Sequence, residues 1–297
     1  MAAATGYGDA PTEEELLEYG DLPRHGRDMA EVFAVRVPAA AGGGKDSPPP
    51  CGSIFFHGGN SCSDLIYSRD RSGTDEPAAT QPCDSEGNLV LIGPSVATSA
   101  YGPVGFDIHF HDGRHGESSL QADDDGRNTG RIFCDTVSGE FSTYDRVITE
   151  TVDTGYGPAD VVYAVLSNAV QGRVAVKLTA LPAGGRADDG AATGVLGRVV
   201  ARSKLLDAGC VLFYIERDGE GVPVRTGELV PLARQALAVP LHKPLTIELN
   251  LRNDSGEEIV RGAVEFNPAI TGEHMERAIG MSGAEIQVTV SWSDYPW

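Results

Sequence analysis

Apolar and polar side chains alternate along much of the chain with a period of two residues. The clearest example is the run Arg173–Ala180, in which Val174, Val176 and Leu178 alternate with small or polar side chains. Successive side chains of a β-strand point to opposite faces of a sheet, so this pattern predicts a strand with one buried face.

The same kind of pattern recurs from Met29 to the C-terminus and predicts about fourteen strands. The first runs from Met29 to Pro38. The others are Gly52–His57, Asp64–Asp70, Asn88–Ile92, Val104–His111, Phe141–Val152, Asp160–Leu166, Arg173–Ala180, Val195–Lys204, Cys210–Arg217, Leu229–Val239, Leu245–Arg252, Ile259–Asn267 and Ala284–Trp292. Turn sequences rich in Gly, Asn and Asp separate them, which is typical of antiparallel strands.

These strands predict an all-β fold, either an antiparallel sandwich of two sheets or a partly closed barrel. The segment Val211–Ile215 is apolar throughout, so we expect it in the middle of a sheet with both faces covered. No long linker divides the pattern, and we therefore expect residues 29–297 to form a single domain. Residues 1–28 are acidic and lack an apolar face, which predicts a disordered tail.

Composition narrows the classes of function. The formal net charge is −20, because 43 acidic residues outnumber 23 basic ones. Such a charge repels phosphate backbones, so we expect no nucleic acid bound through a basic face. The first 28 residues have neither the basic start nor the apolar run of a secretory signal, and no segment has the length of a membrane span. We expect no membrane partner.

The five cysteines indicate a reducing compartment. They are odd in number and scattered, with no Cys-x-x-Cys pair. We expect reduced thiols in the cytoplasm, with the nucleus as the alternative. One disulfide among Cys51, Cys62 and Cys83 is left open as a second interpretation.

A metal site is one interpretation of the run Asp107–Glu117. His109 and His111 lie two residues apart on a strand, so both imidazoles share a face with Asp107. His57, His115 and Glu117 are further candidate ligands, in the manner of a cupin barrel. The simpler interpretation is a solvent-facing polar stripe on a strand whose Ile108 and Phe110 face the core. We prefer it, because the spacing of Glu117 and the settings of the later histidines differ from the cupin pattern.

Other candidate sites are weaker. Asp123–Asp125 are contiguous, whereas calcium loops alternate their ligands, so a polar turn is expected. Cys134 lies in an apolar strand that does not activate a thiol. Gly42–Gly44 lack the sequence of a phosphate-binding loop. We assign no catalytic, cofactor-binding or metal-binding residue.

The sequence Arg69-Asp70-Arg71 follows a predicted strand and admits two interpretations. The arginines could clamp a carboxylate or phosphate ligand, or they could form an internal network with Asp70 that fixes a loop. We favour the network, which predicts that Asp70 is partly buried and bonded to an arginine or to backbone N–H groups.

A family resemblance begins at these residues. The runs Leu65–Arg71, Leu89–Pro94, Val104–Ile108, Asp160–Val165 and Val288–Trp292 resemble the plant domain of unknown function 6598. The likeness extends roughly from Met29 to Trp297. It implies an all-β domain of grasses, found alone or behind the ribosome-inactivating domain of jasmonate-induced defence proteins. It brings no enzymatic activity, so no site residue is carried over from it.

The resemblance raises the question of whether the chain is itself an rRNA N-glycosylase. That family is expected to carry a Glu-Ala-x-Arg helix, and the segment Glu273–Ala278 has the wrong spacing. Two hypotheses therefore stand. The first is a non-catalytic interaction module with a protein partner, linked to defence. The alternative is a metal-dependent cupin-like enzyme that uses Asp107, His109, His111 and His115.

Overall fold

A computed structural model describes most of the chain, and every regular element in the described part is a strand. It describes residues 26–37, 49–59, 63–69, 81–111, 129–134, 144–154, 156–181, 192–216 and 219–294. The strands are β1 (Arg27–Arg36), β2 (Cys51–His57), β3 (Ser63–Arg69), β4 (Thr98–Ser99), β5 (Val104–His111), β6 (Thr129–Cys134), β7 (Val147–Thr154), β8 (Gly157–Ala180), β9 (Thr193–Ser203), β10 (Ala208–Ile215), β11 (Val222–Val224), β12 (Ala236–Pro240), β13 (Leu245–Asn253), β14 (Glu258–Phe266), β15 (Thr271–Ile279) and β16 (Glu285–Ser293).

The strands form three antiparallel sheets. A seven-stranded sheet has the order β15-β16-β8-β1-β4, with β7 and β12 also paired to β8. A five-stranded sheet has the order β10-β9-β13-β14, with β11 on β9, and a four-stranded sheet has the order β3-β2-β5-β6. The predicted all-β sandwich is confirmed. Within the described residues there are three sheets instead of two, and none of these closes into a barrel.

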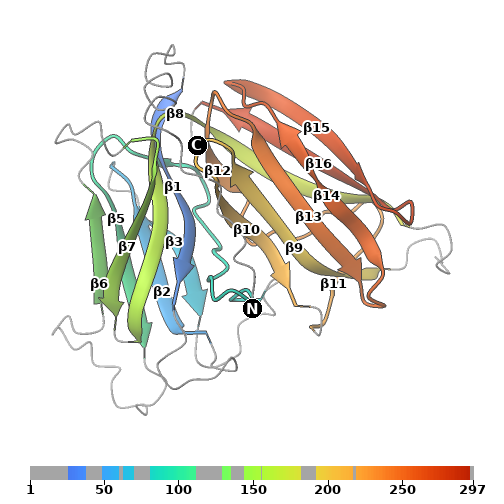
Figure 1. Ribbon diagram of the computed structural model, residues 1–297, viewed down its shortest axis with the longest axis horizontal. Helices are drawn as coiled ribbons and strands as arrows, with labels where there is room; N and C mark the ends of the chain where they lie inside the picture. Colours follow the sequence, from blue (N-terminus) through green and yellow to red (C-terminus); the bar gives the residue numbers. More distant parts are fainter. Residues whose placement is uncertain are drawn as a thin grey trace, which may run out of the picture.

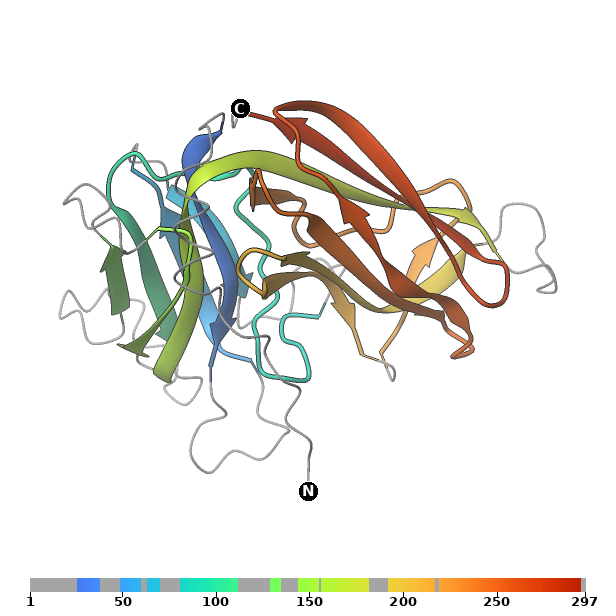
Figure 2. The ribbon, with the colours of Figure 1, turned by 45° about the horizontal axis from the view of Figure 1, so that its top comes forward.

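The long strand β8 gives the molecule two sandwiches (Figures 1 and 2). Its first part lies with β1 and β7 against the four-stranded sheet, and we call this the N-terminal sandwich. Its second part lies with β12, β15 and β16 against the five-stranded sheet, and we call this the C-terminal sandwich. The sequence predicted two strands here. They are continuous because Ala169, Val170 and Gln171 between them also pair, with β1 and β12.

The alternation read from the sequence builds the core of the C-terminal sandwich. Val174, Val176 and Leu178 are all fully buried, as are Val288 and Val290 on the neighbouring strand β16. Burying a side chain of this size stabilises the fold by about 1.5–3 kcal/mol. The buried side chains that alternate along these strands therefore provide much of the stability of the C-terminal sandwich.

The position predicted for Val211–Ile215 is wrong in one respect. The segment is buried on both faces, as expected, but β10 is the end strand of its sheet. Its outer face packs on the N-terminal sandwich, where Val211 and Tyr214 meet Val90. Its outer edge is capped by irregular backbone, since Gln81 N–H donates to Tyr214 O at 2.8 Å and Ala233 N–H to Leu212 O at 2.7 Å.

Two predicted strands are mostly irregular, and three observed strands were not predicted, the short strands β4 and β11 and the longer β15. Asn88–Ile92 contains only isolated bridges, and Leu229–Val239 becomes regular at Ala236. Both segments are partly buried and lack a full set of strand partners. Strand β15 escaped prediction because its side chains are almost all exposed and show no apolar alternation.

A buried ion pair ties the sandwiches together. Arg234, 2% exposed, contacts Glu31 of β1 and also donates to Val32 O at 2.8 Å and Ala236 O at 2.9 Å. The second carboxylate oxygen of Glu31 accepts from Ala238 N–H. Burial raises the pKa of Glu31, and the guanidinium of Arg234 opposes that rise. Each group thus depends on the other to be tolerated in the core.

Candidate functional site

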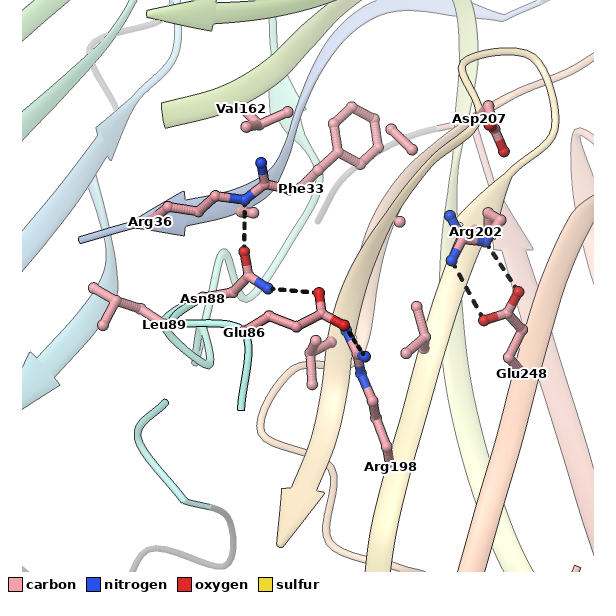
Figure 3. Close-up of a pocket in the computed structure, with 15 residues that line it drawn as sticks. Phe33, Arg36, Glu86, Asn88, Leu89, Val162, Arg198, Arg202, Asp207 and Glu248 are labelled. Carbon is pink, nitrogen blue, oxygen red and sulfur yellow. Dashed lines mark hydrogen bonds and ion pairs between the residues drawn. The ribbon is translucent and has the colours of Figure 1, made fainter. Parts of the chain in front are cut away.

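The junction of the two sandwiches leaves a groove of about 600 Å³ (Figure 3). Strand β1 forms one wall and strand β9, with Glu248 of the adjacent β13, forms the other. Apolar side chains lie at its floor: Phe33, Val162, Val200 and Val211, each with only 6–9% of its surface exposed. Charged groups from both walls surround this floor.

The period of a strand explains why one wall is charged. Arg198, Val200 and Arg202 are two residues apart on β9, so their side chains share the face that lines the groove. Val199 and Ala201 point to the opposite face and belong to the core of the C-terminal sandwich. The same strand therefore presents an apolar face inward and two guanidinium groups to the groove.

The turn Asp84–Asn88 closes one side of the groove. The carboxylate of Asp84, with 1% of its side chain exposed, accepts N–H groups from Glu86 and Asn88, each at 2.9 Å. This is the turn that an Asp side chain favours when it bonds the backbone two residues on. It also accepts the Asn88 side-chain amide at 2.9 Å, which orients Asn88 toward the groove.

Each of the three arginines contacts an acceptor across the groove or along it. Arg36 Nε donates to the side-chain oxygen of Asn88 at 2.8 Å. Arg202 and Glu248 form a two-point contact at 3.0 and 3.5 Å.

Arg198 makes only long contacts, 3.3 Å to Asp84 and 3.4 Å to Glu86, and its buried Nε has no partner among the described residues. Figure 3 shows the contacts of Arg36 with Asn88, of Arg198 with Glu86 and of Arg202 with Glu248. A buried donor without an acceptor is costly, so a ligand oxygen at this place would be stabilised.

The groove is lined by charged groups of both signs around an apolar floor. Its three guanidinium groups are offset by the lining carboxylates of Glu86, Asp207 and Glu248 and by Asp84, which contacts Arg198. The residues that line it include no Cys, His, Ser, Thr or Tyr, and its ionisable groups are arginines and carboxylates. An apolar floor with charged groups of both signs around it is the arrangement of a recognition surface.

The predicted polar stripe on β5 is present. Ile108 and Phe110 are fully buried, whereas Asp107 and His109 are partly exposed on the other face of the strand. The ring of His109 packs edge-on against Phe55, with 6.2 Å between the ring centroids. His111 belongs to β5, but its side chain lies outside the described residues, as do His115 and Glu117.

Asp107 already has two cationic or hydrogen-bonding partners. Its carboxylate contacts Arg131 Nε at 2.7 Å and His57 Nε2 at 2.8 Å. Partial burial would raise the pKa of Asp107, but the hydrogen bonds and charges of Arg131 and His57 outweigh it and lower the pKa. A guanidinium in contact with this carboxylate disfavours a metal cation there. Among the described side chains, no three His, Cys, Asp or Glu residues come together as a metal site.

The structure gives only part of the remaining candidates. Arg69 ends β3 and donates to Pro49 O, which fixes the chain before β2. Asp70 and Arg71 lie outside the described residues, so the predicted network stays a prediction; the same holds for Gly42–Gly44 and Asp123–Asp125. Cys134 is half-buried in strand β6.

Sequence reasoning missed the residues of the groove. Arg198 and Arg202 were part of a predicted strand, and their i, i+4 spacing on it puts them on one face. The spacing of these two arginines could have predicted a charged face on the strand. It could not have predicted which residues lie across from that face. The partner wall, Arg36 and Asn88, is more than a hundred residues away in the chain and meets β9 only in the folded protein.

Comparison with known families gives one match. A family model described as "Domain of unknown function (DUF6598)" matches residues 29–290. No curated protein matches the chain. Within the described residues there is no helix with the length and apolarity to cross a membrane.

Proposed function

The chain belongs to the DUF6598 family, and we propose that it is a non-catalytic interaction module that binds an extended segment of a partner protein in the groove between its sandwiches. The observation that carries the proposal is the composition of that groove. It joins an apolar floor to three arginines and three carboxylates, within a volume of about 600 Å³.

The groove suggests the chemistry of the partner segment. The volume lies within the roughly 300–1,000 Å³ that is typical of ligand sites. Because its charges balance, a polyanion such as nucleic acid gains little there, whereas a peptide presents an apolar side chain and both donors and acceptors. The unpaired Nε of Arg198 calls for one acceptor, which a side-chain carboxylate or a backbone carbonyl supplies.

The biological setting is a further part of the proposal. The resemblance to a plant domain that occurs alone or behind a ribosome-inactivating domain supports a role in plant defence. We therefore propose that the module acts in the cytoplasm and that the partner is a defence protein, with the ribosome-inactivating domain as the first candidate. The net charge of −20 also suits a partner with a basic surface around the bound segment.

A calorimetric titration with a purified ribosome-inactivating domain tests the proposal directly. We expect binding to the wild type, and a loss of at least tenfold in affinity for Arg198→Glu and for Val200→Glu, which change the wall and floor of the groove. The matched control is Arg261→Glu, an exposed residue of β14 outside the groove, which should bind as the wild type does.

The outcomes separate the two parts of the proposal. If both groove variants bind with the affinity of the wild type, the interface lies outside the groove. Absence of binding would reject this partner, and selection from a random peptide library displayed on phage then tests the groove itself. Selected peptides should combine an acidic with an apolar residue, and they should fail to bind the two groove variants.

The metal-dependent alternative has less support. Asp107 is held by Arg131 and His57, and Ile108 and Phe110 of the same strand are buried in the core. Elemental analysis of the purified protein distinguishes the two hypotheses, since only a metal enzyme requires a stoichiometric amount of bound metal.

A further inference from the structure

Strand β15 is an edge strand with an unusual degree of exposure. It is the last strand of the seven-stranded sheet and pairs only with β16 among the described strands. All of its residues except Ala278 are exposed, including Met275 at 49% and Ile279 at 70%. It lies at the outer margin of the C-terminal sandwich (Figures 1 and 2). An edge of this kind is a template for pairing with another strand.

The hairpin that follows β15 shows which backbone groups face the open edge. Gly280 N–H donates to Ala284 O at 2.9 Å, and Gly283 N–H donates to Gly280 O at 3.0 Å, so both polar groups of Gly280 point toward β16. In an antiparallel pair this direction alternates from residue to residue. The N–H and C=O groups of Glu273, Met275 and Arg277 therefore point away from β16, toward the open edge.

The sequence of β15 is complementary to itself when it is read antiparallel. With Met275 opposite Met275 of a second copy, Glu273 lies opposite Arg277 and His274 lies opposite Glu276. We propose that β15 pairs with β15 of a second copy of this chain, around a two-fold axis at Met275, so that the seven-stranded sheet continues across a homodimer. This proposal is independent of the groove and its partner.

The register is fixed by both the backbone and the charges. Residues that offer their backbone groups to the open edge must meet one another, which allows two-fold axes only at a residue and not between residues. An axis at His274 brings no opposite charges together. An axis at Glu276 puts Glu276 against its own copy. Only the axis at Met275 forms two kinds of favourable cross-strand pair, each made twice.

The side chains are also on compatible faces. Glu273 and Arg277 lie on the outer face with the exposed thioether of Met275, while His274 and Glu276 lie on the other face. Trp292 Nε1 donates to His274 Nδ1 at 3.3 Å, which leaves the proton of the neutral ring on Nε2. That N–H is thereby available for the carboxylate of Glu276 on the second copy.

The charge pattern selects a second copy as the occupant. Natural edges carry charged residues to prevent pairing, and charges of one sign serve that purpose best. Here opposite charges meet in one of the registers that the backbone allows, the one with its axis at Met275. Two copies of net charge −20 also repel each other at long range, so local complementarity is needed for this edge to associate.

Sedimentation velocity of the full chain tests the proposal over a concentration series at physiological ionic strength. We expect a monomer–dimer equilibrium in the micromolar range for the wild type. Arg277→Glu and Glu273→Arg should each weaken it by roughly tenfold or more, because each places like charges opposite one another twice. The control Arg261→Glu makes the same change of charge on the neighbouring strand β14 and should leave the dimer unchanged.

Two further samples make the test specific to this register. The double variant Glu273→Arg/Arg277→Glu should dimerise again, and so should an equimolar mixture of the two single variants, since both restore Arg–Glu pairs. Circular dichroism establishes that each variant is folded. A wild type that stays monomeric at every soluble concentration overturns the proposal. So does a dimer that the single variants do not weaken, or one that neither the double variant nor the mixture restores.

Discussion

The two sandwiches share strand β8 but are filled in different ways. The core of the N-terminal sandwich contains a group of aromatic rings among its aliphatic side chains. The ring centroids of Phe56 and Phe106 lie 4.7 Å apart, and those of Phe106 and Tyr163 lie 5.2 Å apart. The C-terminal sandwich has a core made largely of Val, Leu and Ile side chains. Large rings therefore fill part of the N-terminal core, whereas branched aliphatic side chains fill most of the C-terminal core.

This difference affects how each sandwich responds to damage. Removing one ring from the N-terminal core opens a large cavity, because the packed neighbours move only in part to fill it. An aliphatic core divides the same volume among many side chains, so each substitution has a smaller local effect. Two rings of the N-terminal core also donate hydrogen bonds through their hydroxyl groups. The hydroxyl of Tyr163 donates to Glu150 at 2.6 Å, and that of Tyr67 donates to Pro50 O at 2.7 Å.

The largest expected effect comes from the link between the sandwiches. Arg234→Met removes the partner of Glu31 and leaves two backbone carbonyls without their donor, so it should destabilise the protein by about 3–5 kcal/mol. Unfolding in urea, followed by circular dichroism, measures the change. The control is Arg225→Met, which breaks the exposed pair with Glu228 and should change stability by less than about 1 kcal/mol. Equal effects of the two substitutions would mean that the buried pair does not join the sandwiches.

Because the two sandwiches share β8, we expect a substitution that destabilises one sandwich to destabilise the other as well. Phe106→Ala should destabilise the N-terminal sandwich by about 3–5 kcal/mol. In a Trp297→Phe background the only tryptophan is Trp292, which is buried in the C-terminal sandwich. Because β8 runs through both cores, both should unfold together. The unfolding midpoint measured by Trp292 fluorescence should therefore fall as far as the midpoint measured by circular dichroism. A fluorescence midpoint that does not move would show that the sandwiches unfold independently.

A smaller effect is expected for the turn that lies between the sandwiches. Asp84→Ala leaves the N–H groups of Glu86 and Asn88 without their acceptor, and it should destabilise the protein by about 1–3 kcal/mol. The exposed Asp153 of β7 provides the control, since Asp153→Ala should change stability by no more than about 0.5 kcal/mol. Thermal melts of both variants beside the wild type give the comparison. If Asp84→Ala melts like the control, its bonds do not stabilise the fold.

The smallest effect is a pH dependence in the N-terminal sandwich. The pKa of Asp107 is lowered in the folded state, so its contribution is fully present above the ordinary value near 3.8. It is lost as the pH falls through the lowered pKa, and it amounts to less than about 1 kcal/mol for so exposed a pair. Asp107→Asn should therefore reduce stability near pH 7 and match the wild type at the acid end. An equal difference at both pH values would contradict this.

The sequence alone determined the class of fold, since the alternation of apolar and polar residues predicted most of the strands. Val174, Val176 and Leu178 on β8 are an example, because a period of two needs only local geometry to specify a buried face. The same reasoning placed Ile108 and Phe110 in the core and Asp107 and His109 outside it.

The tertiary structure decided what lies on the second face of each strand. Nothing in Val211–Ile215 shows that its outer face meets the N-terminal sandwich, and nothing in Arg198 and Arg202 shows that Arg36 and Asn88 lie across from them. Strand β15 could not be predicted from the alternation of apolar and polar residues, because an exposed strand needs no apolar face. The charged residues that it carries can nevertheless be read from the sequence. Local sequence specifies which side of a strand is apolar. Contacts between segments a hundred residues apart depend instead on how all the strands pair. That pairing creates both the groove and the open edge.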